Sequence, residues 1–132
     1  MNFIGVVAAL STFLSVWFGH VAVRKVESIS PTIWLPSFVF TALAFLVAFF
    51  SLSATSQSLS VALGIFAITL LIDALELRRQ QNRVRKGHAP ANPANPRHAK
   101  ILAQHSSATT LDLLKRDPTG KPIPVGSNST NL

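Results

Sequence analysis

The stretch Leu59–Lys86, LSVALGIFAITLLIDALELRRQQNRVRK, runs from an apolar segment directly into a basic one. Its apolar part, Leu59–Leu77, is about 19 residues long, and a helix of that length spans about 30 Å, the thickness of a bilayer's hydrocarbon core. Two apolar segments of similar length precede it, at Phe3–Val23 and Thr32–Leu52. The sequence therefore predicts an all-α protein with three transmembrane helices in a small bundle.

The chain changes character after the third apolar segment. Residues 74–86 hold strong helix formers and no breaker before Gly87, so the third helix is expected to continue into the cytoplasm. We therefore separate a transmembrane domain, residues 1–86, from a basic tail rich in proline and asparagine, residues 87–132. This C-terminal tail is expected to be extended, mostly irregular and cytoplasmic.

Prolines recur at every third position of the tail from Pro90 to Pro96. This spacing favours a polyproline-like strand without internal hydrogen bonds. Two short helices are expected after it, at residues 97–104 and 110–116, the second with a threonine as its cap and a proline beyond its end.

The net charge of +7 is distributed unevenly. Within residues 1–72 the only charged side chains are Arg24, Lys25 and Glu27. Cytoplasmic flanks of membrane helices carry an excess of Lys and Arg. The link after the first segment and the run after the third are basic, whereas residues 53–58 are uncharged. This pattern predicts three spans in a bacterial inner membrane, with the N-terminus periplasmic and the tail cytoplasmic.

The basic run after the third segment is expected to contact anionic lipid headgroups or acidic surfaces of partner subunits, because it directly follows a membrane helix. Its members are Arg78, Arg79, Arg83, Arg85 and Lys86. A uniformly basic soluble protein would instead indicate nucleic acid, which is not expected as a partner here.

Each apolar segment carries a row of small residues at alternating spacings of three and four, and such rows let helix backbones approach each other in lipid. The members expected at helix contacts are Gly5, Ala8, Thr12, Ser15 and Gly19 in the first segment, and Gly64 and Ala67 in the third. Chance is the alternative, because small residues are abundant in these segments. The phenylalanines of the second segment are left to face lipid, a neighbouring subunit or a bound pigment.

Three ionisable residues lie inside the predicted spans, where such groups are costly: His20, Asp73 and Glu76. All three lie at the inner ends of their helices, so we interpret them as polar pairing groups that set helix depth. A His20–Asp73 pair would join two helices. Glu76 is within reach of Arg78 or Arg79 on its own helix, or of Arg24 across the bundle. A proton relay across the membrane is disfavoured, because the outer half contains no ionisable side chain.

His20 has a second interpretation as the ligand of haem iron or chlorophyll magnesium, since imidazole suits such metals. The chain has no cysteine, which excludes disulfides and thiolate metal sites. It also shows no phosphate loop, nucleophile elbow or zinc pattern. We therefore expect no enzyme activity, no catalytic residue, no metal site and no intrinsic cofactor, although lipid, carotenoid or chlorophyll of neighbouring subunits could lie against the helices.

Three stretches, MNFIG at residues 1–5, GHVAVRK at 19–25 and NRVRKGHAPANP at 82–93, resemble a family of short bacterial integral membrane proteins of unknown function. In that family a charged helix end leads into a glycine and then an Asn-Pro pair. The resemblance covers residues 1–96. It implies a three-span bacterial membrane protein and leaves its role open.

The leading hypothesis is a structural accessory subunit of a large bacterial bioenergetic membrane complex, photosynthetic or respiratory, in which the helices pack on a larger core and the tail clamps neighbouring subunits. One alternative is a free-standing homo-oligomer that acts as a small transporter or sensor. Another is a membrane subunit that binds pigment or haem through His20.

Overall fold

The computed structural model describes residues 3–112 of the chain. They form four helices: α1 (Ile4–Ile29), α2 (Trp34–Ser53), α3 (Gln57–Arg85) and α4 (Pro96–Gln104). The first three are long and apolar enough to cross a membrane, and this part of the chain contains no strand. The predicted all-α fold with three apolar helices is confirmed.

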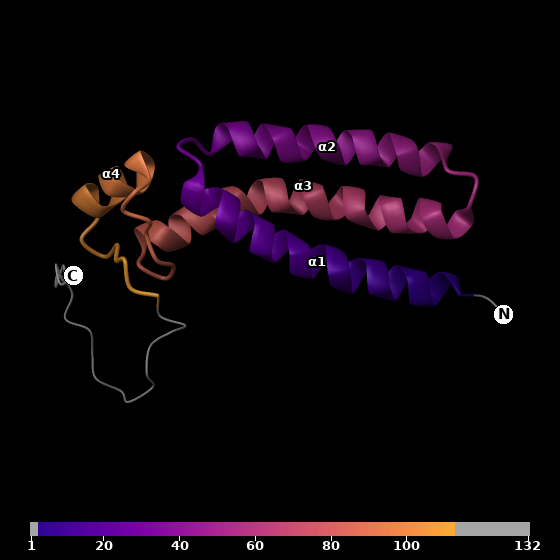
Figure 1. Cartoon of the computed structure of the whole chain (residues 1–132), viewed down its shortest axis with the longest axis horizontal. Coiled ribbons are helices and arrows are strands. Elements are labelled where there is room, and N and C mark those ends of the chain that lie inside the picture. The colour runs from indigo at the N-terminus through magenta and orange to yellow at the C-terminus, as the bar shows by residue number, and fades with distance from the viewer. Residues whose placement is uncertain (1–2, 113–132) are drawn as a thin grey trace, which may run out of the picture.

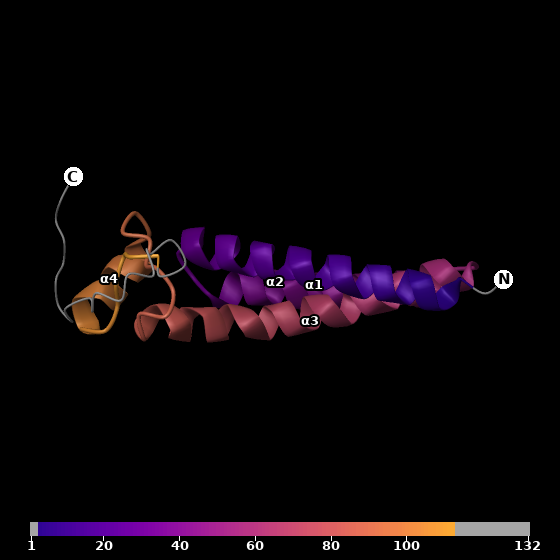
Figure 2. The ribbon, with the colours of Figure 1, turned by 90° about the horizontal axis from the view of Figure 1, so that it is seen from below.

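Helix α3 lies between α1 and α2 and packs against both of them (Figure 1). At 29 residues it is the longest helix, and its C-terminal part projects beyond its two neighbours. The α1–α2 connection, this projecting end and α4 all lie at the end of the bundle opposite the N-terminus (Figures 1 and 2). Both basic flanks of the predicted topology are therefore at the same end.

The contact between α1 and α3 uses a narrow face of α1 whose buried residues are spaced by four: Ser15, Gly19, Val23 and Glu27. Gly19 faces the Asp73 carboxylate so closely that a Cβ at position 19 would lie only 2.7 Å from Oδ1. The missing side chain therefore allows α3 to approach α1 at this level. The other expected members of the row differ: Ala8 is half-buried, and Gly5 and Thr12 are exposed.

The contact between α2 and α3 is anchored at its loop end by two serines that exchange hydrogen bonds. The Ser51 hydroxyl donates to the carbonyl of Ser60 at 2.7 Å, and the Ser60 hydroxyl donates to the carbonyl of Ser51 at 2.9 Å. Gly64 lies beside Ser51, and Ala67 is buried one turn further along. Because both serine hydroxyls find partners across the interface, no donor is left facing lipid there.

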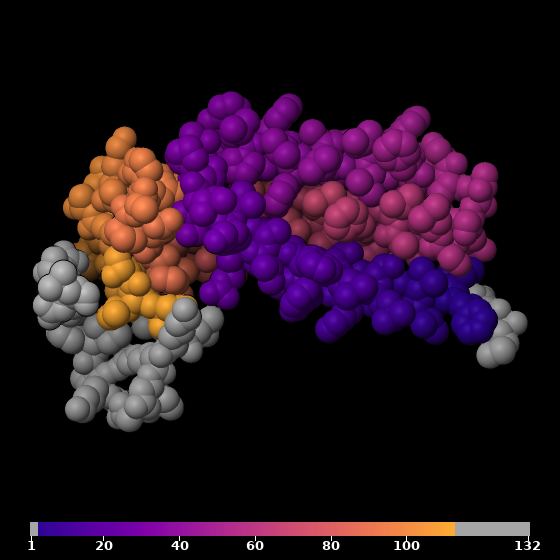
Figure 3. All heavy atoms as spheres, viewed as in Figure 1, coloured from indigo at the N-terminus to yellow at the C-terminus, as the bar shows by residue number. Residues whose placement is uncertain are grey.

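Large apolar side chains are exposed on all three long helices. Figure 3 shows one face of the bundle that these helices form. On α2 the phenylalanines Phe38, Phe45, Phe49 and Phe50 are 53–66% exposed, and only Pro36 and Ala44 are buried. In water such a surface would aggregate, whereas in a bilayer it is in contact with an equally apolar solvent.

The first part of the tail is folded rather than extended. Asn95 N–H donates to the carbonyl of Asn92 at 3.0 Å, which closes a turn over Pro93 and Ala94. The expectation of a polyproline-like strand without internal hydrogen bonds is therefore wrong for this segment. The predicted helix at 97–104 is confirmed as α4. The second predicted tail helix lies mostly outside the described residues, and its described part, residues 110–112, is not helical.

A small apolar cluster holds α4 against the projecting end of α3. It consists of Val84, Ala89, Ala91 and Ile101, with Leu102 and Ala108 packed at its edge. Gly87 makes the required turn with a φ of 73°, a conformation that residues with a side chain rarely adopt. A Cβ at this position would also meet the backbone of Ser107, whose hydroxyl donates to the carbonyl of Arg85 at 2.8 Å.

Candidate functional site at the tail-bearing end of the bundle

Glu27, in the last turn of α1, is the centre of a buried polar cluster. Its side chain is only 2% exposed. Arg97 Nη1 donates to Glu27 Oε1 at 2.9 Å, and His98 Nε2 lies 2.9 Å from the same oxygen. Both partners belong to the first turn of α4. The carboxylate is therefore neutralised by a cation from the tail, as a buried charge requires.

The tautomer of His98 follows from its two hydrogen bonds. Asn92 N–H donates to His98 Nδ1 at 2.8 Å, so Nδ1 carries no hydrogen. The ring hydrogen is then on Nε2, which donates to Glu27. The fully buried imidazole thus links the Asn92 turn to the end of α1. Both ring nitrogens are occupied, so His98 has no free position for a metal ion.

The same tail segment also satisfies the backbone carbonyls at the end of α1. The last carbonyls of a helix lack partners within it and carry partial negative charge. Arg97 Nη2 donates to the carbonyl of Glu27, and Arg97 Nε donates to that of Ser30 at 3.2 Å. Asn95 Nδ2 donates to Ser28 and Ser30 at 3.0 and 2.9 Å, and Asn92 Nδ2 donates to Ser28 at 3.1 Å. The tail is therefore a tertiary cap for α1.

The two asparagines have a second role in their own segment. Asn95 Oδ1 accepts from Arg97 N–H at 2.9 Å, which caps the N-terminus of α4, and Pro96 follows at the first helical position. Asn92 Oδ1 accepts from Ala94 N–H at 3.1 Å. Each side chain thus shapes the tail with its oxygen and holds α1 with its nitrogen. We call this arrangement of Glu27, Asn92, Asn95, Arg97 and His98 the tail dock.

A second, more exposed ion pair group lies on α3. Glu76 Oε1 is 2.7 Å from Arg83 Nη2, and Glu76 Oε2 is 3.3 Å from Arg79 Nη1. Both arginines belong to the basic run that was expected to contact headgroups. Arg79 was also an expected partner of Glu76, whereas Arg83 was not. Arg24 is not a partner of Glu76.

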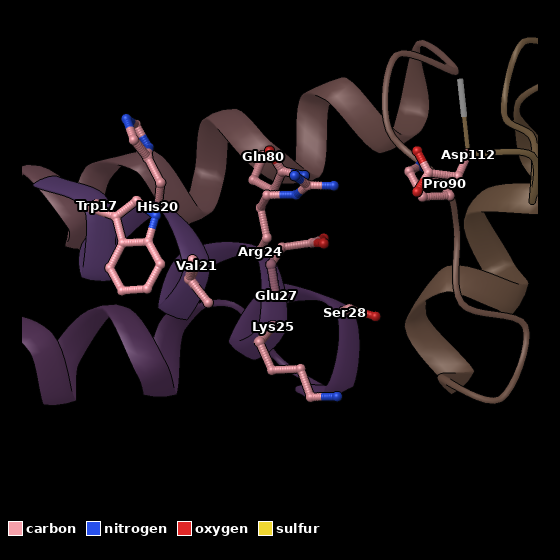
Figure 4. A pocket seen from close by; sticks show the side chains of 10 residues that line it. All are labelled: Trp17, His20, Val21, Arg24, Lys25, Glu27, Ser28, Gln80, Pro90 and Asp112. Carbon is pink, nitrogen blue, oxygen red and sulfur yellow. The ribbon is translucent and has the colours of Figure 1, made fainter. Parts of the chain in front are cut away.

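His20 and Asp73 are close enough to interact electrostatically, but no ion pair joins them in residues 3–112. Asp73 is buried against Gly19, whereas His20 is exposed on α1. His20 lines an open hollow together with Trp17 and Arg24 (Figure 4). Among the residues that the structure describes, no group of three or more His, Cys, Asp or Glu side chains could hold a metal ion.

The tail dock was missed by the reasoning from sequence, which took Glu27 only as part of a charged link and the prolines as an extended strand. Two signals pointed to it. Glu27 is the only acidic residue before Asp73, and Asn95-Pro96 is the cap-and-first-turn pair of a helix start. Neither signal identifies the partner, because α1 and α4 are far apart in sequence.

Fold and site together define a small membrane protein with three apolar helices and a folded polar cap at one end. A family model described as a domain of unknown function, DUF4491, matches residues 2–95. The match covers well over half of the chain, and the protein belongs to this family, as the resemblance to an uncharacterised family suggested. No curated protein and no solved structure matches the chain. The matched region includes Glu27, Asn92 and Asn95, and ends before Arg97.

Proposed function

We propose that this protein is a non-catalytic accessory subunit of a larger complex in the bacterial inner membrane, with its N-terminus in the periplasm and its tail in the cytoplasm. The observation that carries the proposal is a contrast between its polar groups and its apolar surface. Glu27 and Glu76 form ion pairs with arginines of the same chain, whereas α1 and α3 leave the aromatic face of α2 exposed.

The paired acids argue for structure rather than chemistry. A general base or a proton carrier needs an acid whose proton can be exchanged with substrate or with a chain of such groups. Glu27 is buried and bound by Arg97 and His98, and Glu76 is flanked by two guanidinium groups. These contacts stabilise one arrangement of the helices, which suits a subunit that has to present a fixed surface.

The aromatic face of α2 and the tail dock supply two surfaces for neighbours. On α2, phenylalanines that α3 leaves uncovered are available to a larger apolar core. At the tail-bearing end, the dock holds α4 in place, so its outer side, including Lys100, faces away from the bundle. We propose that α2 packs on the core of the complex and that α4 contacts its cytoplasmic subunits. The photosynthetic or respiratory nature of that complex stays a prediction from sequence.

The test is to isolate the tagged full-length protein from native membranes in mild detergent and to determine the size and composition of its complex. The double variant Phe45→Ala/Phe49→Ala should lose the partner polypeptides, because it removes the α2 contact surface. The matched control, Phe13→Ala/Phe18→Ala, changes equally exposed residues on α1 and should retain them. Equal retention by both variants would assign the α2 face to lipid. A complex that contains only copies of this chain would favour the homo-oligomer, and a Soret or Qy band would favour pigment binding.

The proposed orientation has a separate test that uses the absence of cysteine from the chain. Thr55→Cys, in the α2–α3 link, should react with a membrane-impermeant maleimide in whole cells in which only the outer membrane has been made permeable. His105→Cys, just beyond α4, should react only after lysis. The opposite labelling pattern would reverse the topology.

A further inference from the structure

An open hollow of about 730 Å³ lies on the outer side of α1 where the helix meets the tail (Figure 4). Its lining combines basic side chains, apolar side chains and parts of the tail. The residues on α1 are Trp17, His20, Val21, Arg24, Lys25, Glu27 and Ser28, and those from the rest of the chain are Gln80, Pro90 and Asp112. Of the residues of the tail dock, Glu27 lines the hollow and the other four do not.

Within the described part of the chain, Arg24 and Lys25 form no ion pair, in contrast to three arginines nearby. Arg79, Arg83 and Arg97 each contact a glutamate. In residues 3–112, neither Arg24 nor Lys25 forms a side-chain hydrogen bond or an ion pair, and both are exposed. Glu27 does not neutralise them, since its carboxylate is bound by Arg97 and His98. The hollow therefore holds two cations that form no ion pair among the described residues.

The depth of these residues indicates which kind of anion fits. Trp17 precedes Arg24 by seven positions, which corresponds to about 10 Å along a helix. Tryptophan is typical of the interface between hydrocarbon and headgroups, and lysine and arginine place their charges at headgroup level. A ligand that spans both positions needs an anionic head beside Arg24 and Lys25, and an apolar body along Val21 and Trp17.

We propose that this hollow is a specific site for an anionic phospholipid, with the phosphate held by Arg24 and Lys25 and an acyl chain lying along Val21 and Trp17. Gln80 of α3 offers an amide next to Arg24 (Figure 4). Asp112 is the second acidic residue of the lining besides Glu27, and it lies beside Pro90 at the tail side, away from Trp17. The phosphate therefore binds on the α1 side of the hollow. This site is distinct from the basic run at the end of α3.

The experiment is a lipid titration of the full-length protein in mild detergent, read by native mass spectrometry, with dioleoyl phosphatidylglycerol and dioleoyl phosphatidylcholine as probes. Each cation close to anionic headgroups contributes on the order of fivefold in affinity. The double variant Arg24→Gln/Lys25→Gln should therefore lose at least about tenfold in affinity for the first phosphatidylglycerol. Arg78→Gln/Arg85→Gln removes the same charge from exposed positions of the basic run, outside the hollow, and should lose clearly less affinity for the first phosphatidylglycerol.

Two further measurements separate a built lipid site from its alternatives. The swap Arg24→Lys/Lys25→Arg preserves both charges and should retain binding, which also guards against a folding defect in the neutral variant. Soluble glycerol 3-phosphate, which has the head without the chain, should not displace the lipid at equal concentration. Equal losses in the two neutral double variants would show diffuse charge attraction and overturn the proposal. Displacement by glycerol 3-phosphate, or equal affinity for both lipids, would overturn it as well.

Discussion

Arg97 of α4 donates to the buried carboxylate of Glu27 in α1 at 2.9 Å, although the two residues are 70 positions apart. Around this bond, two asparagines and a histidine from the tail bind the end of α1. The apolar cluster of Val84 and Ile101 ties the same tail to α3. The tail is thus attached to two membrane helices. It is held to the end of α1 by hydrogen bonds and an ion pair, and to the end of α3 by apolar packing.

Glu27→Gln should release the tail from α1. Removing one member of a buried ion pair leaves the other charge uncompensated, at a cost on the order of 3 kcal/mol. Hydrogen exchange of residues 88–104 in detergent should therefore increase strongly. The matched control is Glu76→Gln, whose arginine partners are 68% and 52% exposed and whose loss should cost about 1 kcal/mol or less.

A second variant checks that the effect comes from charge. In Glu27→Gln/Arg97→Gln no buried charge remains without a partner, so the loss of protection should be smaller than the sum of the single losses. Additive losses, or equal effects of the Glu27 and Glu76 variants, would contradict the assignment of the ion pair as the main attachment of the tail.

Gly19→Ala should weaken the contact between α1 and α3. The added methyl group meets the Asp73 carboxylate, and overpacking of this kind costs about 1–3 kcal/mol. Unfolding in a titration with sodium dodecyl sulfate, followed by circular dichroism, measures the loss. Gly5→Ala is the control, because a Cβ at position 5 meets nothing within 4 Å. Asp73→Ala, combined with Gly19→Ala, should recover part of the stability, and a lack of recovery would contradict the proposed clash.

The Ser51–Ser60 exchange of hydrogen bonds should stabilise the α2–α3 contact. Hydrogen bonds between membrane helices contribute about 0.6–1.7 kcal/mol each. In a double-mutant cycle of Ser51→Ala and Ser60→Ala, we expect a coupling free energy on the order of 1 kcal/mol in the same unfolding titration. Ser53→Ala should have little effect, because its hydroxyl donates to Phe49 within its own helix. A coupling energy near zero would show that the two serines act independently.

Asn95→Ser should separate the two roles of this side chain. A serine oxygen can still cap α4, but it is too short to reach the carbonyls of Ser28 and Ser30. Asn95→Ala loses both roles and should be less stable than Asn95→Ser by about 1 kcal/mol, the typical value of a helix cap. Hydrogen exchange of α4 measures the difference. Equal exchange in both variants would mean that the cap contributes nothing to stability. The control is Asn82→Ala, which changes an exposed residue of α3.

Much of the architecture followed from local pattern. The apolar segments predicted three long helices, and the lack of a breaker before Gly87 predicted that the third would continue beyond the membrane. A short helix was expected at residues 97–104, where α4 lies. The bounds differ mainly at α1, which extends to Ile29 instead of ending near Val23. Arg24 and Lys25, which were assigned to a cytoplasmic link, therefore lie within this helix, and the tail binds carbonyls at its end.

Sequence by itself determined that this chain has three membrane-length helices and where its charge gathers, because hydropathy and charge act over short stretches and need no knowledge of distant neighbours. Only the tertiary structure decided that Glu27 pairs with Arg97 and His98, that Gly19 faces Asp73, and that Gly5 stays exposed. These contacts depend on the rotation of each helix about its axis and on the return of the tail to α1. Both result from packing among segments far apart in the chain, which a local pattern does not contain.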